Sequence, residues 1–390
     1  MMKKVLIVSL DKFPDGNAGA TRQRILSELI LENNPEAQIT HLGFGESTNF
    51  EYIRYKKNIK YLSMKRKYIK STKISNIISY FLFRLNLKKL LKKENYNFDT
   101  FIVISIPLLS LMFLKKVALK KNINLIHDSV EWYSSSEFNL GKLNYFYLEK
   151  DIMNRFLIDK NFKVISISNY LNKYFRSKGI RSVRIPFILD VKRITSNKNV
   201  EENKITFMYA GMLGKKDLLL NFFEAFSLLS EDARKKCRII IFGPSLKEMI
   251  ETKNLDEMLY KKIKKQLEIK GRVPRNEVTK QMEKVDFTIL FRPEYERYAK
   301  AGFPTKVVES MSYSTPVFCN ISSDLKEYLV DGSNSIISES TETEKILEGL
   351  KKIVNLDYKQ RLSMQNNARE TALEKFDFSN YSKELEELEI

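Results

Sequence analysis

The chain has 390 residues, a formal net charge of +19 and two cysteines, Cys237 and Cys319. This length exceeds what one hydrophobic core usually supports, so we expect two domains. The cysteines lie far apart in apolar runs, which argues against a disulfide scaffold or a cysteine-rich zinc site and fits a reducing compartment. No apolar run reaches the roughly 18–20 residues that a transmembrane helix requires.

Short apolar strands alternate with helical stretches along the first half. Residues 4–10 predict a buried first strand rather than a signal peptide, because the apolar run is short and no small-residue cleavage site follows it. Residues 21–31 predict a helix. Further buried strands are predicted at residues 101–105, 124–126 and 163–168. This alternation is typical of a parallel sheet with helices on both faces.

The pattern breaks at residues 190–204, which are polar and without apolar periodicity, and we interpret them as a linker. Alternation then restarts. Strands are predicted at residues 205–210, 238–242, 287–291 and 317–319, and helices at residues 218–229, 247–250, 256–264, 306–313, 343–374 and 380–388. We therefore predict two doubly wound α/β domains, residues 1–192 and 193–375, with a C-terminal helix of about 376–390 packing back on the first. The cleft between the carboxyl ends of their strands is the expected ligand site.

The net positive charge is concentrated in residues 54–93, which contain many lysines and arginines, interleaved aromatics and no acidic residue. We interpret this segment as a patch for an anionic membrane surface or a lipid-linked acceptor. Its central residues would be Lys56, Lys57, Lys65, Arg66 and Lys67. The alternative is a solvated basic face over aromatic core residues.

Two places in the first half carry candidate site residues. Gly16 and Gly19 lie between the first strand and the first helix, where the backbone can approach a ligand and helix amides suit an anion. The loop does not match GxGxxG, and an ordinary glycine-containing loop is the alternative. His127 and Asp128 lie where a buried strand ends, and we predict them to be catalytic. A hydrogen-bonded core histidine is the alternative, and a metal site is not expected because only two histidines occur.

The second half offers a phosphate-binding pattern. After the strand at residues 205–210 come Gly211, Lys215 and Lys216, and glycines with ammonium groups before a helix suit a diphosphate. The spacing does not match a Walker loop.

A second group follows the strand at residues 287–291. Arg292 comes directly after that strand, and Thr305 and Lys306 begin a helix after a proline. Glu309 lies one turn further, among apolar neighbours, where a carboxylate needs a ribose diol or a basic partner.

Several blocks resemble the family 4 retaining glycosyltransferases of the GT-B fold, which have two Rossmann-like domains. The blocks are "FMYAGMLGKKDLLLNFFEAF", "IIIFGP", "VDFTILFRP", "FPTKVVESMSYSTPVFCN" and "LKEYLVDGSNSIIS". They cover most of residues 205–340 in the family's order. The first half matches more loosely, through its glycine loop, "IHDSVEWY", "VISISNYLNKYF" and "IPFILD".

The resemblance implies a nucleoside-diphosphate sugar as donor and transfer without a bound metal or other cofactor. Glu309 resembles the carboxylate that holds the donor ribose, and Lys215 or Lys216 resembles the basic residue on the diphosphate. Gly211 would lie beneath that diphosphate, with Thr305 and Lys306 beside it. His127 resembles the histidine near the anomeric region of the sugar, and Gly16 and Gly19 resemble the loop that closes over donor and acceptor.

The sequence departs from the family at two positions. Many members carry a glutamate eight residues before the ribose-binding one, and Ala301 occupies that position here. Glu294 or Glu296 would have to replace it, or the donor sugar differs. Met212 follows Gly211, so the basic pair of the family is incomplete.

The resulting prediction is a cytoplasmic enzyme, peripheral at the inner face of the membrane, that transfers a sugar to a saccharide or lipid-linked acceptor in glycan or surface polysaccharide synthesis. The rival hypotheses are a basic nucleic-acid-binding protein and a sugar-nucleotide epimerase or a phosphorylase of the same architecture. The first lacks a recognised nucleic-acid motif, and we expect no nucleic acid as partner. An epimerase needs further acid/base groups, and a phosphorylase needs a lysine for a pyridoxal cofactor. A donor-binding but inactive protein is also compatible with Ala301.

Overall fold

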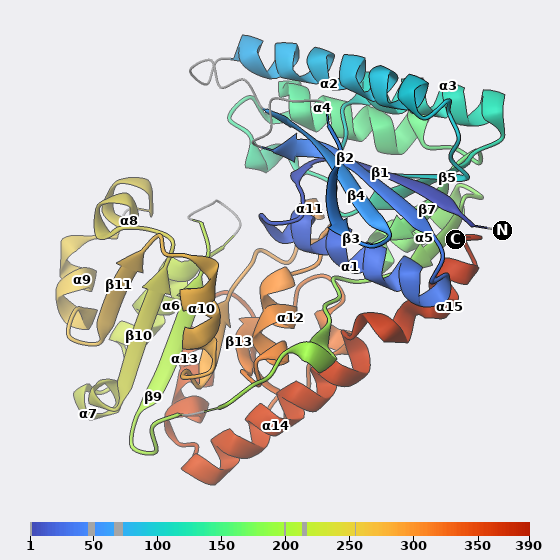
Figure 1. Cartoon of the computed structure of the whole chain (residues 1–390). Coiled ribbons are helices and arrows are strands. Elements are labelled where there is room, and N and C mark those ends of the chain that lie inside the picture. The colour runs from blue at the N-terminus through green and yellow to red at the C-terminus, as the bar shows by residue number, and fades with distance from the viewer. Residues whose placement is uncertain (1, 46–50, 66–72, 199, 213–216, 254) are drawn as a thin grey trace. The chain divides into compact units, whose positions relative to one another are not determined.

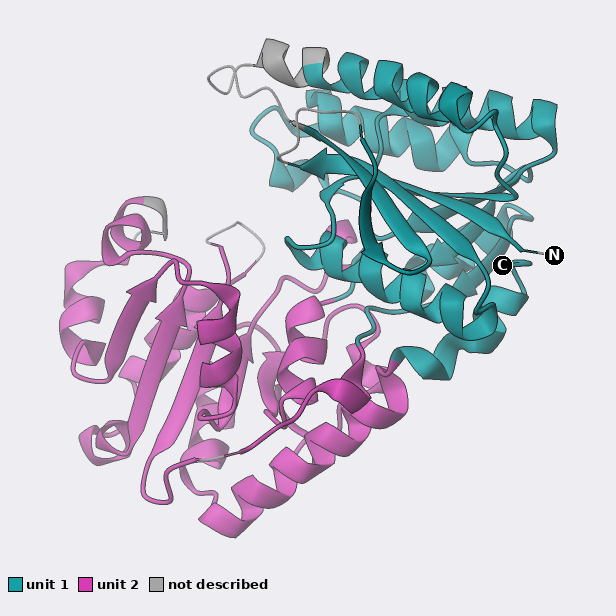
Figure 2. Cartoon of the chain, viewed as in Figure 1, with its two compact units in different colours: residues 1–189, 301–303, 378–390 teal, residues 190–300, 304–377 magenta. Residues whose placement is uncertain are grey.

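A computed structural model describes residues 2–45, 51–65, 73–198, 200–212, 217–253 and 255–390 (Figure 1). The chain divides into two compact units (Figure 2). Unit 1 comprises residues 1–189, 301–303 and 378–390, and unit 2 comprises residues 190–300 and 304–377. The last residues of the chain therefore belong to the same unit as its beginning.

Unit 1 is built on an eight-stranded sheet within its described residues, in the order β3-β4-β2-β1-β5-β6-β7-β8. The strands are β1 (Lys4–Lys12), β2 (Gln38–Gly45), β3 (Ile53–Lys56), β4 (Ile59–Lys65), β5 (Thr100–Ile104), β6 (Asn124–Ser129), β7 (Lys163–Ser166) and β8 (Arg181–Arg184). Only the pairing of β3 with β4 is antiparallel among these strands. Strand β5 is buried throughout and β1 is buried along its middle, as expected for a parallel sheet covered on both faces.

The helices of unit 1 lie on both faces of this sheet (Figure 1). They are α1 (Ala18–Asn33), η1 (Ser135–Glu137), η2 (Gly141–Leu143), α2 (Lys73–Lys93), α3 (Leu108–Lys121), α4 (Tyr145–Ile152), η3 (Met153–Leu157), α5 (Asn169–Ser177), η6 (Phe378–Tyr381) and α15 (Ser382–Glu386). Leu385, Leu388 and Ile390 at the C-terminus are buried in the same apolar core as Leu26 of α1. Burial of these side chains holds the end of the chain against unit 1.

Unit 2 contains a parallel six-stranded sheet in its described part, in the order β11-β10-β9-β12-β13-β14. The strands are β9 (Ile205–Ala210), β10 (Cys237–Phe242), β11 (Leu267–Gly271), β12 (Phe287–Leu290), β13 (Val317–Asn320) and β14 (Ser335–Ser338). Counted from β9, this is the strand order of the dinucleotide-binding Rossmann fold. The order reverses between β9 and β12, so ligands are expected beyond the carboxyl ends of these two strands.

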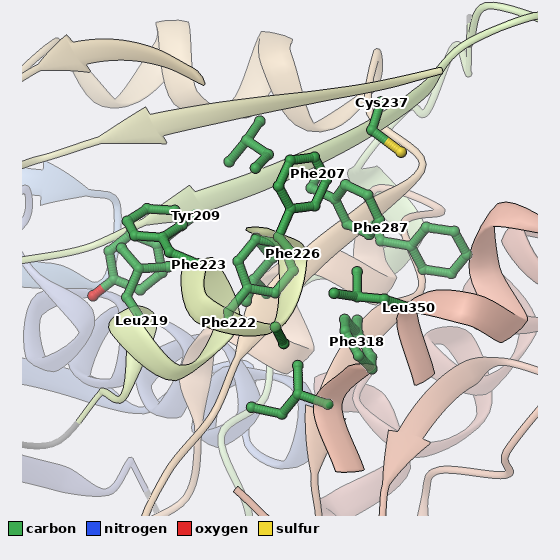
Figure 3. Close-up of a cluster of buried hydrophobic side chains, with 14 of the residues drawn as sticks. Phe207, Tyr209, Leu219, Phe222, Phe223, Phe226, Cys237, Phe287, Phe318 and Leu350 are labelled. Carbon is green, nitrogen blue, oxygen red and sulfur yellow. The ribbon is translucent and has the colours of Figure 1, made fainter. Parts of the chain in front are cut away.

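The helices of unit 2 follow the same alternation. They are η4 (Val191–Arg193), α6 (Leu219–Ser227), α7 (Glu231–Lys235), α8 (Leu246–Lys253), α9 (Glu257–Ile263), α10 (Arg275–Met282), α11 (Arg297–Ala301), α12 (Thr305–Ser312), η5 (Leu325–Glu327), α13 (Thr343–Val354) and α14 (Tyr358–Lys375). Phenylalanines dominate the core between α6 and the sheet (Figure 3). The rings of Phe207 and Phe222 are 5.6 Å apart and those of Phe291 and Phe318 are 5.0 Å apart. Such aromatic pairs add to the energy of burial.

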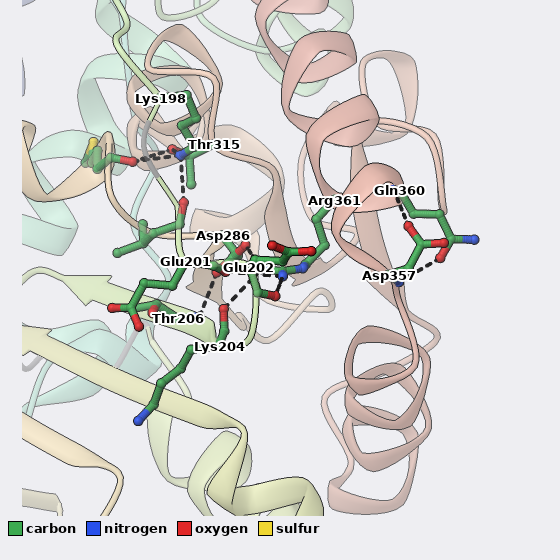
Figure 4. Close-up of polar contacts among 12 residues, drawn as sticks. Lys198, Glu201, Glu202, Lys204, Thr206, Asp286, Thr315, Asp357, Gln360 and Arg361 are labelled. Atoms are coloured by element: carbon green, nitrogen blue, oxygen red, sulfur yellow. Dashed lines mark hydrogen bonds and ion pairs between the residues drawn. The ribbon is translucent and has the colours of Figure 1, made fainter.

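The polar segment predicted as a linker is held in place by unit 2 (Figure 4). The Lys198 ammonium group donates to the carbonyls of Met282 and Val285, at 2.9 and 2.6 Å, and to the Thr315 hydroxyl at 2.6 Å. The Arg361 guanidinium group is buried, forms an ion pair with Asp286 and also donates to backbone carbonyls of residues 201, 202 and 204. These contacts were not visible in the sequence because their partners lie 75 or more residues away.

The prediction of one helix over residues 343–374 was wrong. The structure has α13 and α14 there, separated by a short connection. The Asp357 side chain accepts from the amide of Gln360, and the Gln360 side chain accepts from the amide of Asp357 (Figure 4). This capping box starts a new helix, since it satisfies amides that would otherwise lack partners.

Candidate functional site

The carboxyl ends of β9 and β10 bring two glycines together. The Gly211 amide donates to the Phe242 carbonyl at 3.1 Å, and Gly243 has a φ of +111°. A Cβ atom on Gly243 would lie 2.0 Å from the Gly211 carbonyl oxygen. A Cβ atom on Gly211 would lie 2.3 Å from Nζ of Lys306. Gly243 therefore allows the two backbones to meet at this edge of the sheet, and a side chain at Gly211 would displace the end of Lys306.

Asp217 is the centre of a charged cluster at the same edge. Its carboxylate forms ion pairs with Nζ of Lys306 and, at 3.0 Å, with Nε of Arg292. The Tyr209 hydroxyl donates to it at 2.9 Å. Nζ of Lys306 also lies 4.3 Å from the centre of the Tyr209 ring. Two cations and one carboxylate leave a net positive charge, which suits an anionic ligand.

Strand-end contacts fix Arg292 at this cluster. The Arg292 amide donates to the Asn320 side chain at 2.9 Å, and the Asn320 side-chain amide donates back to the Arg292 carbonyl at 2.9 Å. Arg292 follows β12, and Asn320 ends β13. The two adjacent parallel strands therefore fix the backbone position from which the Arg292 side chain extends.

The pKa values of the cluster reflect both burial and charge. Burial raises the pKa of Asp217, but Lys306 and Arg292 outweigh it and hold this pKa well below its usual range. Burial lowers the pKa of Lys306, and the Asp217 carboxylate opposes that effect. The ion-pair geometry leads us to assign the charged form to both groups near neutral pH.

Glu309 lies one turn after Lys306 on α12 and faces a different partner. Its carboxylate forms a 2.7 Å ion pair with Arg275, the first residue of α10. The Glu309 side chain is 23% exposed, so a polar ligand can reach it. Burial raises the pKa of Glu309, while Arg275 and Lys306 lower it. The carboxylate therefore has one basic partner in place and remains accessible as an acceptor.

The structure brings Gly211, Arg292, Lys306 and Glu309 to one end of the unit 2 sheet. Thr305 is the first residue of α12 and is half-buried. Lys215 and Lys216 lie outside the described residues. Ala301 is fully buried and its carbonyl accepts from the Ser168 hydroxyl at 2.7 Å. Of its suggested replacements, Glu294 is exposed and Glu296 half-exposed.

Three residues of this site were not singled out from the sequence. Asp217 and Tyr209 were quoted only as parts of a resembling block, and Arg275 was not noticed. An acid directly after two lysines in a basic loop was the available signal for Asp217. Arg275 had no signal, because only the packing of α10 near α12 pairs it with Glu309.

In unit 1, His127 and Asp128 both lie on β6 but have different surroundings. His127 is 1% exposed, and neither ring nitrogen has a hydrogen-bond partner among the described residues. Burial and the nearby Lys150 charge hold the pKa of His127 well below its ordinary value, so the imidazole is neutral. An unsatisfied buried imidazole is costly, and a bound polar group would relieve that cost.

Asp128 is fully buried and both of its oxygens contact Arg22. The distances from Nε and Nη2 of Arg22 to the carboxylate are both 2.7 Å. Arg22 also donates to the carbonyls of Pro186 and Ile185. This bidentate pair ties α1 to β6, directly beside His127 in the sequence. The sequence did not single out this role for Arg22.

The predicted glycine loop at the start of α1 already contains a carboxylate. A Cβ atom on Gly19 would lie 2.0 Å from Oδ2 of Asp11, whereas Gly16 is exposed. The Asn17 side chain donates to Asp11 at 2.9 Å and accepts from the Ala20 amide at 3.2 Å. The negative charge expected at this helix start is therefore supplied in part by Asp11.

Two of the residues predicted as the centre of the membrane and acceptor patch have described side chains. Lys56 forms an ion pair with Glu28 at 2.5 Å, and Lys57 is exposed. Lys65 ends β4. Arg66 and Lys67 lie outside the described residues. None of the helices in the described ranges combines the length and hydropathy needed to cross a membrane.

Each unit has the Rossmann-like fold, and the solved structures that resemble the chain have the GT-B fold of glycosyltransferases. The sucrose-phosphate synthase of Thermosynechococcus elongatus shares this fold with a TM-score of 0.78 and 12% identity, over 99% of this chain and 98% of that one. HepE of Anabaena, solved in complex with UDP and glucose, matches with a TM-score of 0.64 and 13% identity, over 99% and 98% of the two chains.

The sequence comparisons also find similarity to glycosyltransferases. Residues 190–371 match the family Glycosyl transferases group 1. The uncharacterized glycosyltransferase MJ1069 of Methanocaldococcus jannaschii is 24% identical over 291 residues, which cover 72% of this chain and 71% of that protein. Residues 190–371, which match the family, contain β9, the Asp217 cluster and Glu309.

Proposed function

We propose that the protein is a retaining glycosyltransferase that moves a sugar from a nucleoside-diphosphate sugar to a saccharide acceptor. The observation that carries this proposal is the net positive cluster of Lys306 and Arg292 around Gly211, one helical turn from the accessible carboxylate of Glu309. In a nucleoside diphosphate, the diphosphate and the ribose diol are also separated by about the length of one helical turn. The two features together match that ligand better than either does alone.

The donor diphosphate would take the place next to Gly211. Lys306, Arg292 and the amides at the start of α12 would stabilise the negative charge that develops as the nucleoside diphosphate leaves. Glu309 would accept hydrogen bonds from the ribose hydroxyls. These protein cations supply the charge neutralisation, so we propose transfer without a metal or other cofactor.

For the transfer step we propose front-face attack. The acceptor oxygen forms its bond to the anomeric carbon on the face from which the diphosphate departs, and the acceptor proton passes to a departing phosphate oxygen. The anomeric centre is oxocarbenium-like at the transition state. His127 is assigned to the anomeric region from the family resemblance, and its neutral, unpartnered imidazole is able to accept or donate one hydrogen bond there.

We further propose that the acceptor is lipid-linked and that the enzyme works at the cytoplasmic face of a membrane in glycan or surface polysaccharide synthesis. The high net charge of +19 supports attraction to an anionic surface.

The test is a calorimetric titration of the purified protein with UDP, GDP and other nucleoside diphosphates. UDP comes first because HepE, which shares the fold, was solved with UDP. The affinity of the Glu309→Ala variant for the preferred diphosphate should be about tenfold to hundredfold lower than that of the wild type. This is the contribution of one or two charge-assisted hydrogen bonds. Glu277→Ala, which removes an exposed carboxylate from α10, is the charge-matched control and should bind normally.

Two results would contradict the proposal. One is the absence of any nucleoside diphosphate binding together with strongly salt-dependent binding of nucleic acid, which would favour the rival hypothesis. The other is equal loss of binding in the two glutamate variants.

Once the preferred nucleotide is known, the donor sugar is identified by product formation with sugars of that nucleotide. The anomeric configuration of the product tests retention.

A further inference from the structure

A groove of about 700 Å³ lies on unit 1 between α2 and α3, the two helices that run side by side in Figure 1. Its apolar lining comes mainly from α3, with Leu109, Met112 and Phe113. Its lining includes neither His127 nor Asp128. Neither the donor chemistry nor the core of unit 1 accounts for it.

The rim of this groove is strongly cationic. Five basic side chains line it, Arg84 and Lys88 from α2 and Lys116, Lys120 and Lys121 from α3. None of the five has a carboxylate within ion-pair distance in the part of the chain that the structure describes, and the lining contains no acidic residue. Arg84 and Lys88 lie 5.9 and 5.5 Å from the centre of the Phe113 ring. Cations held over an aromatic floor favour an anionic ligand with an apolar part.

Exposed apolar side chains surround the groove. On α3, Leu109 is 59% exposed and Leu119 is 57% exposed, and on α2 Phe81 is 60% exposed. Helix α4 lies beside the start of α3, because the Leu108 amide donates to Glu149 at 2.8 Å. Exposed residues there are Tyr145, Phe146, Leu148 and Ile152. Exposed apolar side chains on three neighbouring helices are typical of an interaction surface.

We propose that the α2–α3 groove binds the phosphate head group of an anionic membrane phospholipid and seats unit 1 on the bilayer. The five cations contact the phosphates, and the exposed side chains of α2, α3 and α4 enter the interface between head groups and acyl chains. The inference narrows the membrane location in the proposed function to one surface. Its test does not depend on the donor site.

This surface differs from the one that the sequence suggested. Lys56 is paired with Glu28, and Lys60 is paired with Glu94 at 2.9 Å, so these cations are largely neutralised. The basic residues around the groove come instead from the second half of the basic segment and from α3. Helix α3 was not part of the predicted patch.

The experiment measures co-sedimentation of the full chain with phosphatidylcholine vesicles that contain or lack phosphatidylglycerol. Lys116→Glu with Lys120→Glu reverses two exposed charges of the groove, and Lys56→Glu with Lys57→Glu makes the same change of charge in the predicted patch. A third variant, Leu109→Ser with Met112→Ser, removes apolar side chains without changing the charge. Thermal unfolding and nucleoside diphosphate titration of each variant show whether the fold and the donor site remain intact.

The wild type should bind only the anionic vesicles. The groove double reversal should lower the partition coefficient at least thirtyfold, since each lysine near an anionic surface contributes a factor of about five. The apolar variant should also weaken binding, and the Lys56/Lys57 variant should stay within about threefold of the wild type. Equal losses in the two charge-reversal variants would overturn the proposal. So would binding of single-stranded RNA, rather than vesicles, that depends on Lys116 and Lys120.

Discussion

Replacing Asp217 by Asn should lower the free energy of unfolding but increase the affinity for the nucleoside diphosphate. In the structure this carboxylate occupies the two cations, Lys306 and Arg292, that a diphosphate would use. A phosphate bound to the same cations would lie about 6 Å from the carboxylate, where repulsion between unit charges is about 3 kcal/mol at an effective dielectric constant of 20. Solvent access to the site reduces this value. We expect nucleoside diphosphate to bind about tenfold to hundredfold more tightly to the variant.

The same substitution removes the anionic partner of two partly buried cations. The side chains of Lys306 and Arg292 are 25% and 19% exposed, so the loss should be smaller than for a fully buried pair, about 1–2 kcal/mol of unfolding free energy. Urea unfolding and calorimetric titration measure the two effects separately. Lys306→Met is the control, and it should lose both stability and affinity.

The opposite sign of the two effects is the decisive feature. If Asp217 only positions its neighbours, Asp217→Asn should bind diphosphate more weakly, in parallel with its lower stability. That result would refute the competition between the carboxylate and the donor. It would leave the donor site itself intact, provided that the wild type still binds.

Three further predictions concern stability. Gly243→Ala should lower the free energy of unfolding by more than about 2 kcal/mol, because its Cβ would meet the Gly211 carbonyl. Gly271 is also at positive φ but has open space around it, so Gly271→Ala should cost only about 1 kcal/mol. Urea unfolding of both variants separates the steric cost from the conformational cost. Arg22→Met should destabilise by about 3–5 kcal/mol, since it leaves the buried Asp128 carboxylate unpaired, and unfolding indistinguishable from wild type would contradict this role. Burial lowers the pKa of His41 from 6.5 to about 3, so below pH 6.5 the unfolded state binds more protons than the folded state. Stability should be lost as the pH falls, by about 1.5–2 kcal/mol from this residue between pH 6.5 and 5, and the slope should be shallower in His41→Gln.

The sequence by itself determined the fold class and most strand positions. Buried strands such as β1 and β9 are short, continuous apolar runs, and a parallel sheet covered on both faces requires that pattern at every central strand. It also singled out Gly211, Arg292, Lys306 and Glu309 as candidates, because strand ends and helix starts are local features and such sheets collect ligands at those ends.

Only the tertiary structure decided which charges meet. The partners of Lys306, Arg292 and Glu309 are Asp217 and Arg275, which are separated from them by 34 to 89 residues in the chain. The same holds for the groove between α2 and α3, since an exposed cation and a paired one look identical in a sequence. Pairing and exposure depend on how separate elements pack, and no local pattern of residues encodes that packing.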